Sequence, residues 1–304
     1  MPKEELAGVL GSHGIDTSSL DLLFSPDGHE VYGLTLPGER ALTTWGQLRD
    51  LSGQTGHWPV ILGAEEELKF HCQSIEEPYA RVSVREILGK AEAIDVDRLL
   101  ENRLLSLAEL EGDEWEAFSE MLTRKADELG EGSYIDVVSE WAAHIDKVPG
   151  RRKVMLEQLL RERAGEWPDI AEPHNYFSIP YEWTGDYTRL KPLRSVRLAL
   201  VPTTSSWEVP AYLKFGTWND CPSPEEHVAV LKHWNTQYGA QVVGLTHDVL
   251  EVGVTRPPNS KLSAFNLARE QYGYCADIVD QGDGGLLDLA ATLLDASVWY
   301  FWWD

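Results

Sequence analysis

Apolar and polar positions follow two different periods along the chain, and these periods predict its elements. Apolar residues spaced by three or four predict helices, and short apolar runs that end at Gly or Pro predict buried strands. The N-terminal part combines both patterns. It predicts, in order, a helix over 2–11, a strand over 29–36, a helix over 41–56 and a strand over 57–63.

A helical period holds from about residue 84 to residue 165. Amphipathic segments follow one another there with short breaks and without a sustained heptad repeat, so we expect packed helices rather than a coiled coil. Residues 166–195 then mix Pro, Gly and aromatic residues, including two Trp and three Tyr. Because a solvated linker is poor in large apolar rings, this stretch is predicted to be an ordered crossing segment.

The last third of the chain returns to strands alternating with helices. The helix that starts near residue 223 has the strongest start signal, since Ser223 stands at the N-cap and Pro224 at the first helical position. We expect strands over 196–202, 208–216, 240–246 and 249–254, and helices over 223–239, 260–273 and 285–296.

The chain ends on SVWYFWWD, residues 297–304, which holds five aromatic side chains. Side chains alternate along a strand, so Trp299, Phe301 and Trp303 share one face and the two rings between them share the other. Because both faces are aromatic, we expect this strand inside a sheet that is covered on both sides. The functional alternative is an aromatic platform for a cation or a base, with Asp304 and the terminal carboxylate beside it.

Together these elements predict an α/β protein, with α+β as the alternative. We expect a mixed sheet flanked by helices, built jointly by the two ends of the chain, and a helical middle region. The predicted parts are an N-terminal α/β unit (1–83), a helical insertion or subdomain (84–165), the crossing segment (166–195) and a C-terminal α/β domain (196–304).

Charge narrows the range of partners. The chain has 50 acidic and 26 basic residues, for a net charge of −24. Such a field repels nucleic acid and anionic membranes and attracts basic proteins or cationic small ligands. The three Cys are far apart and odd in number, which indicates no disulfide framework. With no apolar leader or membrane-spanning run, the sequence predicts a cytoplasmic protein.

Four segments of the last third are distinctive: HVAVLKHWNTQYGAQVV, VTRPP, LAREQYGYCADIVDQG and the terminal WYFWWD. In combination they resemble the uncharacterised bacterial domain-of-unknown-function family 4253, over roughly residues 196–304. TGHWPVILG at 55–63 resembles a segment that often precedes this domain. The resemblance implies an actinobacterial or related cytoplasmic protein, and it implies no activity, cofactor or catalytic residue.

The candidate catalytic residues are Cys275, His247 and Asp277. A thiol close to an acid, with a histidine elsewhere in the chain, has the residue types of a nucleophile–base pair. No cysteine-protease signature surrounds Cys275, and unpaired Cys is among the most often buried residues. A buried structural thiol is therefore the alternative.

The candidate ligand-binding residues are Arg256, Glu270, Asp277, Trp302 and Asp304. Arg256 precedes two prolines, so we expect its side chain to project from a stiff loop, where a guanidinium binds carboxylate or phosphate in bidentate fashion. The structural alternative is an ion pair between Arg256 and Glu270 or Asp277.

Neither a metal nor a cofactor is expected. The acids of DIVDQGD are spaced by three, whereas calcium loops place ligands at every second position. Cys221, His227 and His233 are spaced by six, which matches no zinc motif. Nucleotide-binding loops and hydrolase elbows are also missing from the sequence.

These observations favour a non-catalytic binding or protein-interaction protein, an acidic partner of a basic protein. The first alternative is a hydrolytic or metal-assisted enzyme with a site around Cys275, Asp277, Glu270 and Arg256. The second is a small-ligand sensor that uses the Trp-rich face.

Overall fold

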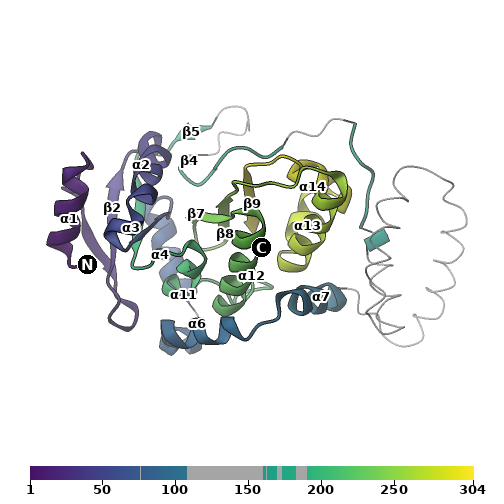
Figure 1. The fold of residues 1–304 in the computed structure, drawn as a ribbon, viewed down its shortest axis with the longest axis horizontal. Helices are drawn as coiled ribbons and strands as arrows, with labels where there is room; N and C mark the ends of the chain where they lie inside the picture. Colours follow the sequence, from purple (N-terminus) through teal and green to yellow (C-terminus); the bar gives the residue numbers. More distant parts are fainter. Residues whose placement is uncertain (76, 108–159, 162, 170–172, 183–189) are drawn as a thin grey trace, which may run out of the picture. The chain divides into compact units, whose positions relative to one another are not determined.

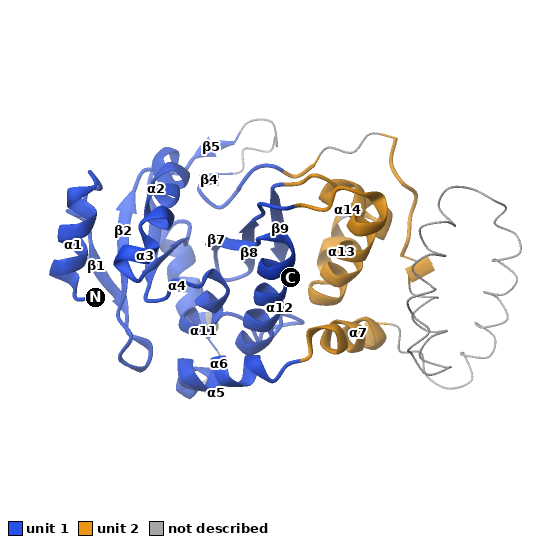
Figure 2. Ribbon diagram, in the orientation of Figure 1, with its two compact units in different colours: residues 1–94, 175–256, 297–304 blue, residues 95–174, 257–296 orange. Residues whose placement is uncertain are grey.

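The computed structural model describes residues 1–75, 77–107, 160–161, 163–169, 173–182 and 190–304 (Figure 1). The chain divides into two compact units (Figure 2). Unit 1 comprises residues 1–94, 175–256 and 297–304, and unit 2 comprises 95–174 and 257–296. Beyond residue 107, most of the predicted helical middle lies outside the described residues.

A mixed seven-stranded sheet forms the centre of unit 1. Its strands, in spatial order, are β1 (Asp21–Phe24), β2 (Val31–Leu36), β6 (Val196–Val201), β3 (Trp58–Ile61), β7 (Gln241–Leu245), β8 (Val249–Gly253) and β9 (Val298–Trp302). Neighbouring strands are antiparallel except for β3 and β7, which are parallel. Both ends of the chain build this sheet, so the predicted α/β class and the shared sheet are confirmed.

Helices flank the sheet. In unit 1 they are α1 (Lys3–Ser12), α2 (Gly38–Asp50), α3 (Ser52–Thr55), α4 (Glu65–Ser74), α5 (Glu77–Arg81), α6 (Val84–Glu92), α11 (Val209–Leu213) and α12 (Pro224–Tyr238). Of these, α1 and α12 begin and end near their predicted positions, the predicted helix over 41–56 is divided into α2 and α3, and α4 and α5 were not predicted. Two 3-10 turns, η1 (Pro26–Gly28) and η3 (Ser206–Glu208), and a small ribbon of β4 (Tyr181–Glu182) and β5 (Lys191–Pro192) complete it. The capping box that Ser223 forms with Glu226 confirms the predicted start of α12.

The predicted strand over 208–216 is wrong. This segment forms η3 and α11, and every residue of α11 is buried. An apolar run that is buried on all sides has the same pattern in a strand and in a helix, so its period does not distinguish them. Pro210 in the first turn favours the helix, because the missing N–H is not needed there.

β9 is the last strand of the sheet, so the prediction of an interior strand is wrong. Within the described residues it pairs with β8 alone. The predicted facing is confirmed: Trp299, Phe301 and Trp303 are buried. The rings of Tyr300 and Trp302 lie on the other face, 5.8 Å apart and half-buried. Large rings retain much of their apolar contact at such a position, which explains an edge strand without a polar face.

Helix α12 covers the buried face of β9. Trp234, fully buried, lies parallel to Phe301 with the ring centres 5.6 Å apart and meets Trp299 edge-on at 5.5 Å. Trp303 makes edge contacts with Phe215, 5.8 Å away. This aromatic cluster holds the C-terminal strand on the sheet, because each buried ring removes on the order of 150–250 Å² from water.

Unit 2 is helical in its described part. It contains α7 (Val96–Leu107), α13 (Lys261–Tyr274), the π-helical turn η4 (Ile278–Asp283) and α14 (Leu286–Leu293). A Cβ on Gly273 would lie 2.9 Å from the carbonyl oxygen of Leu100, so glycine allows α13 and α7 to approach closely. Within the described parts of the chain, no helix has the length and apolar character needed to cross a membrane.

A buried carboxylate on β8 holds the crossing segment against the sheet. Glu251 is 1% exposed and accepts hydrogen bonds from the hydroxyl of Ser178 at 2.6 Å and the backbone N–H of Ile179 at 3.3 Å. Loss of hydration raises the pKa of Glu251 to about 7, although these hydrogen bonds act in the opposite direction.

We expect Glu251→Gln to change how stability depends on pH. Between pH 4.5 and about 7 the folded state holds a proton that the unfolded state has lost, so the wild type loses stability as pH rises through this window. The difference in free energy of unfolding between variant and wild type should therefore change by about 3 kcal/mol, in favour of the variant, as pH rises from 4.5 to 8. Urea unfolding of both proteins at several pH values measures the difference. A difference that is the same at every pH would contradict the assignment.

Candidate functional site

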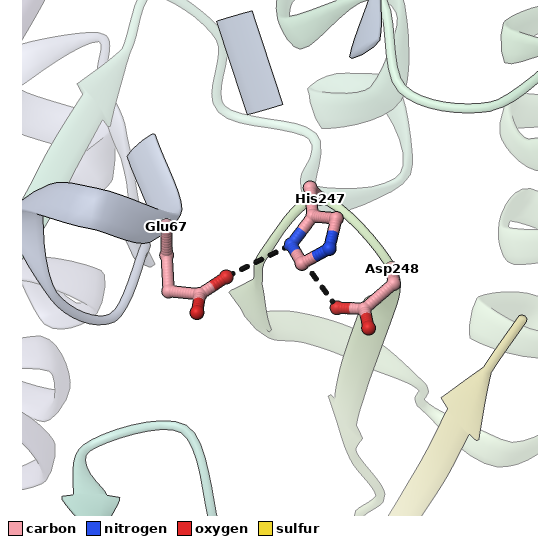
Figure 3. A group of neighbouring side chains, drawn as sticks. All are labelled: Glu67, His247 and Asp248. Atoms are coloured by element: carbon pink, nitrogen blue, oxygen red, sulfur yellow. Dashed lines mark hydrogen bonds and ion pairs between the residues drawn. The ribbon is translucent and has the colours of Figure 1, made fainter. Parts of the chain in front are cut away.

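The parallel strands β3 and β7 end at the same edge of the sheet, and chemistry-bearing side chains gather there. Gly63, in the left-handed region with φ 73°, turns the chain from β3 toward α4, which carries Glu67. The turn after β7 carries His247 and Asp248 (Figure 3). Segments that follow parallel strands meet at one edge, which explains how residues 180 positions apart come together.

Glu67, His247 and Asp248 form a cluster in which one ligand atom of each side chain lies within 4.8 Å of the other two. Nδ1 of His247 lies 2.9 Å from Oε2 of Glu67 and 3.3 Å from Oδ1 of Asp248. Two atoms that each bind a metal at about 2.1 Å lie about 3.0 Å apart at an octahedral angle and about 3.4 Å apart at a tetrahedral angle. Among the described residues, this is the only group of three His, Cys, Asp or Glu residues placed to share a metal.

Hydrogen bonds fix the turn that presents two of the three side chains. The buried hydroxyl of Thr246 donates to Oδ1 of Asp248 at 2.9 Å and accepts from the backbone N–H of Val249 at 3.1 Å. The backbone N–H of Trp303 donates to the backbone oxygen of Asp248 at 3.1 Å. The carboxylate is therefore oriented before any ligand arrives, as outer partners commonly orient metal ligands.

Two aromatic rings flank His247. The ring of Phe70, from α4, lies 5.5 Å away at a tilt of 41°, and the ring of Trp218 lies 6.4 Å away and nearly parallel. Phe70 is 54% exposed, which is uncommon for a large apolar side chain. Two carboxylates and two aromatic rings beside the same imidazole favour a cation over an anion at this site.

The loop that carries Trp218 has a strained backbone. Lys214, Gly216, Thr217 and Asn219 all have positive φ, at 54°, 118°, 81° and 46°. Thr217 is β-branched, and such residues rarely enter the left-handed region. For the non-glycine residues, strain of this kind costs about 1–3 kcal/mol each and clusters at functional sites, which agrees with the position of Trp218 beside the cluster.

The site combines two parts of the sequence. One part is the C-terminal third, which provides Trp218, His247 and Asp248. This third, residues 197–304, matches the domain of unknown function DUF4253. The resemblance seen in the sequence is confirmed. Glu67 and Phe70 lie outside the DUF4253 match, so the N-terminal part completes the cluster. No curated protein and no solved structure matches the chain.

A buried thiol and imidazole also meet within the DUF4253 segment. Sγ of Cys221 lies 3.4 Å from Nε2 of His227, because Cys221 precedes α12 and His227 lies in its first turn. Phe215 and Trp303 pack against the imidazole, with ring centres 4.7 and 5.5 Å away. Among the described residues, no third His, Cys, Asp or Glu joins this pair in a metal-binding arrangement.

The predicted catalytic residues lie in different units. His247 belongs to unit 1, whereas Cys275 and Asp277 belong to unit 2. Cys275 is buried at the end of α13, and Asp277 accepts a hydrogen bond from the amide of Gln281 at 2.9 Å. Their joint role in catalysis stays a prediction, and in unit 1 the observed partners of His247 are the carboxylates of the cluster.

The predicted ligand-binding residues divide in the same way. Arg256, Trp302 and Asp304 lie in unit 1, and Glu270 and Asp277 lie in unit 2. Trp302 is half-buried on β9, and Asp304 is exposed. A common binding role for these five residues remains a prediction.

Arg256 has an observed structural role at the end of α12. Its guanidinium donates to the carbonyl oxygens of Thr236 at 2.8 Å and Asn235 at 3.2 Å. These carbonyls lie in the last turn of the helix, where backbone acceptors have no partner within the helix and a cation is favourable. The guanidinium that caps α12 is the same group that the sequence predicts to pair with an acid or to bind an anion.

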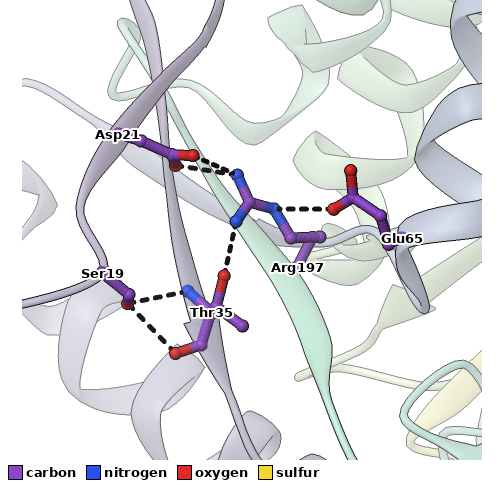
Figure 4. A network of polar contacts seen from close by, with 5 residues as sticks. All are labelled: Ser19, Asp21, Thr35, Glu65 and Arg197. Carbon is purple, nitrogen blue, oxygen red and sulfur yellow. Dashed lines mark hydrogen bonds and ion pairs between the residues drawn. The ribbon is translucent and has the colours of Figure 1, made fainter.

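A second arginine, on β6, is surrounded by partners. Arg197 donates to both carboxylate oxygens of Asp21, at 2.7 and 2.9 Å, and to the hydroxyl of Thr35 (Figure 4). Its Nε lies 3.5 Å from a carboxylate oxygen of Glu65. Two carboxylates thus pair with one guanidinium. The contact with Glu65 fixes the start of α4, which also carries Glu67, against the sheet.

Proposed function

We propose that this protein binds a divalent transition-metal ion, with Zn²⁺ as the first candidate, through Glu67, His247 and Asp248. The observation that carries the proposal is the placement of one imidazole nitrogen within 3.3 Å of two carboxylate oxygens. A mixed nitrogen and oxygen donor set suits Zn²⁺, Mn²⁺, Fe²⁺ or Ni²⁺, whereas Mg²⁺ and Ca²⁺ prefer oxygen ligands throughout.

Three protein ligands leave a coordination position open. Zinc takes four ligands in most protein sites, and an open position holds water or a second ligand. All three side chains are half-buried, so solvent reaches them. A bound metal in this setting serves as a binding point for an additional ligand. Metal-assisted hydrolysis is the alternative, in which the ion lowers the pKa of its water.

The charge of the chain supports a second element of this proposal. A net charge of −24 favours a basic protein or a cationic small ligand as a partner, and disfavours nucleic acid and anionic membranes. A cytoplasmic location belongs to the same proposal.

Calorimetric titration of metal-free, tag-free protein with Zn²⁺ tests the metal site. We expect one ion per chain, and a loss of affinity of at least about tenfold in each of Glu67→Gln, His247→Ala and Asp248→Asn, because even outer partners of metal ligands change affinity by that amount. Binding should also weaken in acid, because an imidazole must lose its proton to bind a metal.

Glu66→Gln is the matched control for Glu67→Gln. Glu66 is exposed on the same first turn of α4 and is not part of the cluster. The substitution Glu66→Gln therefore removes one negative charge without removing a metal ligand. The proposal fails if this control weakens Zn²⁺ binding as much as Glu67→Gln does, since binding would then reflect the general charge of the surface.

A further inference from the structure

A cavity of about 300 Å³ lies in unit 1, apart from the metal cluster. Its walls come from the chain between β1 and η1, from α4 and α5, and from the end of α11. The volume is at the lower end of the range for small-molecule sites, about 300–1,000 Å³. Most of the wall is apolar, including Phe24, Pro26, Ile75 and Leu213. The space therefore suits a small molecule with an apolar body.

One charged group stands in this apolar wall. Lys214 lines the cavity and is only 6% exposed. Its ammonium donates to the carbonyl oxygen of Val82 and lies 3.6 Å from a carboxylate oxygen of Asp27. The same carboxylate oxygen accepts the backbone N–H of Val84. Asp27 is thus shared between two donors, and burial keeps the pKa of the ammonium lowered although Asp27 and Glu86 raise it, so these acids offset the burial only in part.

The backbone at Lys214 is also unfavourable for lysine. The residue occupies the position after α11 with φ 54°, where glycine or asparagine avoids the cost of a left-handed backbone. Burial lowers the pKa of the ammonium, although Asp27 raises it. Burial of the charge and the left-handed backbone both destabilise the folded state at Lys214. Residues kept at such a cost are often functional, so a ligand for this ammonium is expected.

Neutral polar groups accompany this cation. Ser25 and Tyr212 line the cavity and provide hydroxyl groups, and His71 lines it as well. Burial lowers the pKa of His71 to about 4, so its imidazole is uncharged at neutral pH, and its Nε2–H donates to the backbone oxygen of Leu213. The residues that line the cavity therefore include one cation, one neutral imidazole and two side chains with hydroxyl groups.

We propose that this cavity binds a small organic carboxylate, with its apolar body against Phe24, Ile75 and Leu213 and its carboxylate on Lys214. At about 30 Å³ for each water-sized group, the volume holds on the order of ten non-hydrogen atoms. The carboxylate supplies the negative charge that Asp27 supplies only in part, through a charge-assisted hydrogen bond. Glu67, His247 and Asp248 do not line this cavity, so the inference is independent of metal binding.

Fluorine NMR with 4-fluorophenylacetate as the probe tests this inference. The titration is run with a chelator, so that a carboxylate bound to metal does not imitate binding in the cavity. We expect saturable binding to the wild type, at least tenfold weaker binding to Lys214→Met, and at least tenfold weaker binding of the neutral amide of the probe to the wild type.

Two further variants separate a lost site from a lost fold. Ala80→Trp, from an exposed position on the rim, should block the cavity and abolish binding without removing a core side chain. Lys232→Met removes an exposed cation from α12 and should leave affinity unchanged. Absence of binding to the wild type overturns the proposal. Binding that survives both Lys214→Met and Ala80→Trp overturns it as well.

Discussion

Trp234→Ala is expected to lower the free energy of unfolding by about 3–5 kcal/mol, the usual cost of truncating a buried tryptophan. The indole is fully buried between α12 and β9 and contacts both Phe301 and Trp299. Its removal leaves a cavity against the C-terminal strand, which has β8 as its one pairing partner within the described sheet. Urea unfolding followed by circular dichroism measures the loss.

Trp302→Ala provides the matched control on the same strand. This ring is half-buried on the opposite face of β9, so its truncation removes less apolar contact. We expect a smaller loss of about 2 kcal/mol, because about half of the 150–250 Å² of a fully buried ring, at 25 cal/mol per Å², gives this value. Equal losses in the two variants would contradict the assignment of the core to the α12 face.

The second large effect is expected at Gly216, in the strained loop. Its φ is 118°, and a Cβ there would lie 2.0 Å from the backbone oxygen of Pro222. Both the conformation and the space exclude any other residue, so Gly216→Ala should cost about 3 kcal/mol or more. Because this loop positions Trp218, the affinity for Zn²⁺ should fall as well. Unfolding and calorimetric titration of the same sample measure both effects.

Gly46→Ala is the matched control for this substitution. Gly46 lies inside α2, and a Cβ there meets nothing within 4 Å. Alanine is the better helix former, so this variant should gain about 0.5–1 kcal/mol in stability. A similar loss at both glycines would show that the close approach to Pro222 is not the cause.

The apolar period of the sequence predicts most elements of the described fold, because burial on one side leaves a regular trace in a helix or strand. It fails for α11, where burial on every side removes the trace. It also fails for the place of β9, since aromatic residues on both faces indicate burial but not strand order. Pairing between distant strands has no local signal, and the parallel contact of β3 with β7 is of this kind.

The candidate site was predictable only in part. The sequence singled out His247 and placed it between two predicted strands, 240–246 and 249–254. It grouped the histidine with Cys275 and Asp277 instead of with Glu67, because Glu67 lies 180 residues earlier. Three acids, Glu65, Glu66 and Glu67, follow the strand predicted over 57–63. They indicate partners for His247 only when it is known that this strand lies parallel to β7. The sequence does not single out Lys214, because the segment 208–216 that contains it is predicted as a strand and not as a helix that ends at this residue.

X-ray absorption at the zinc edge of the tag-free protein, loaded with one Zn²⁺ per chain, identifies the atoms that bind the ion. The cluster of Glu67, His247 and Asp248 predicts nitrogen and oxygen ligands alone at about 2.0–2.1 Å, with the outer-shell pattern of one imidazole. His247→Ala should remove that pattern. Sulfur ligands at about 2.3 Å would place the ion at a cysteine such as Cys221 and would show that Glu67, His247 and Asp248 do not bind it.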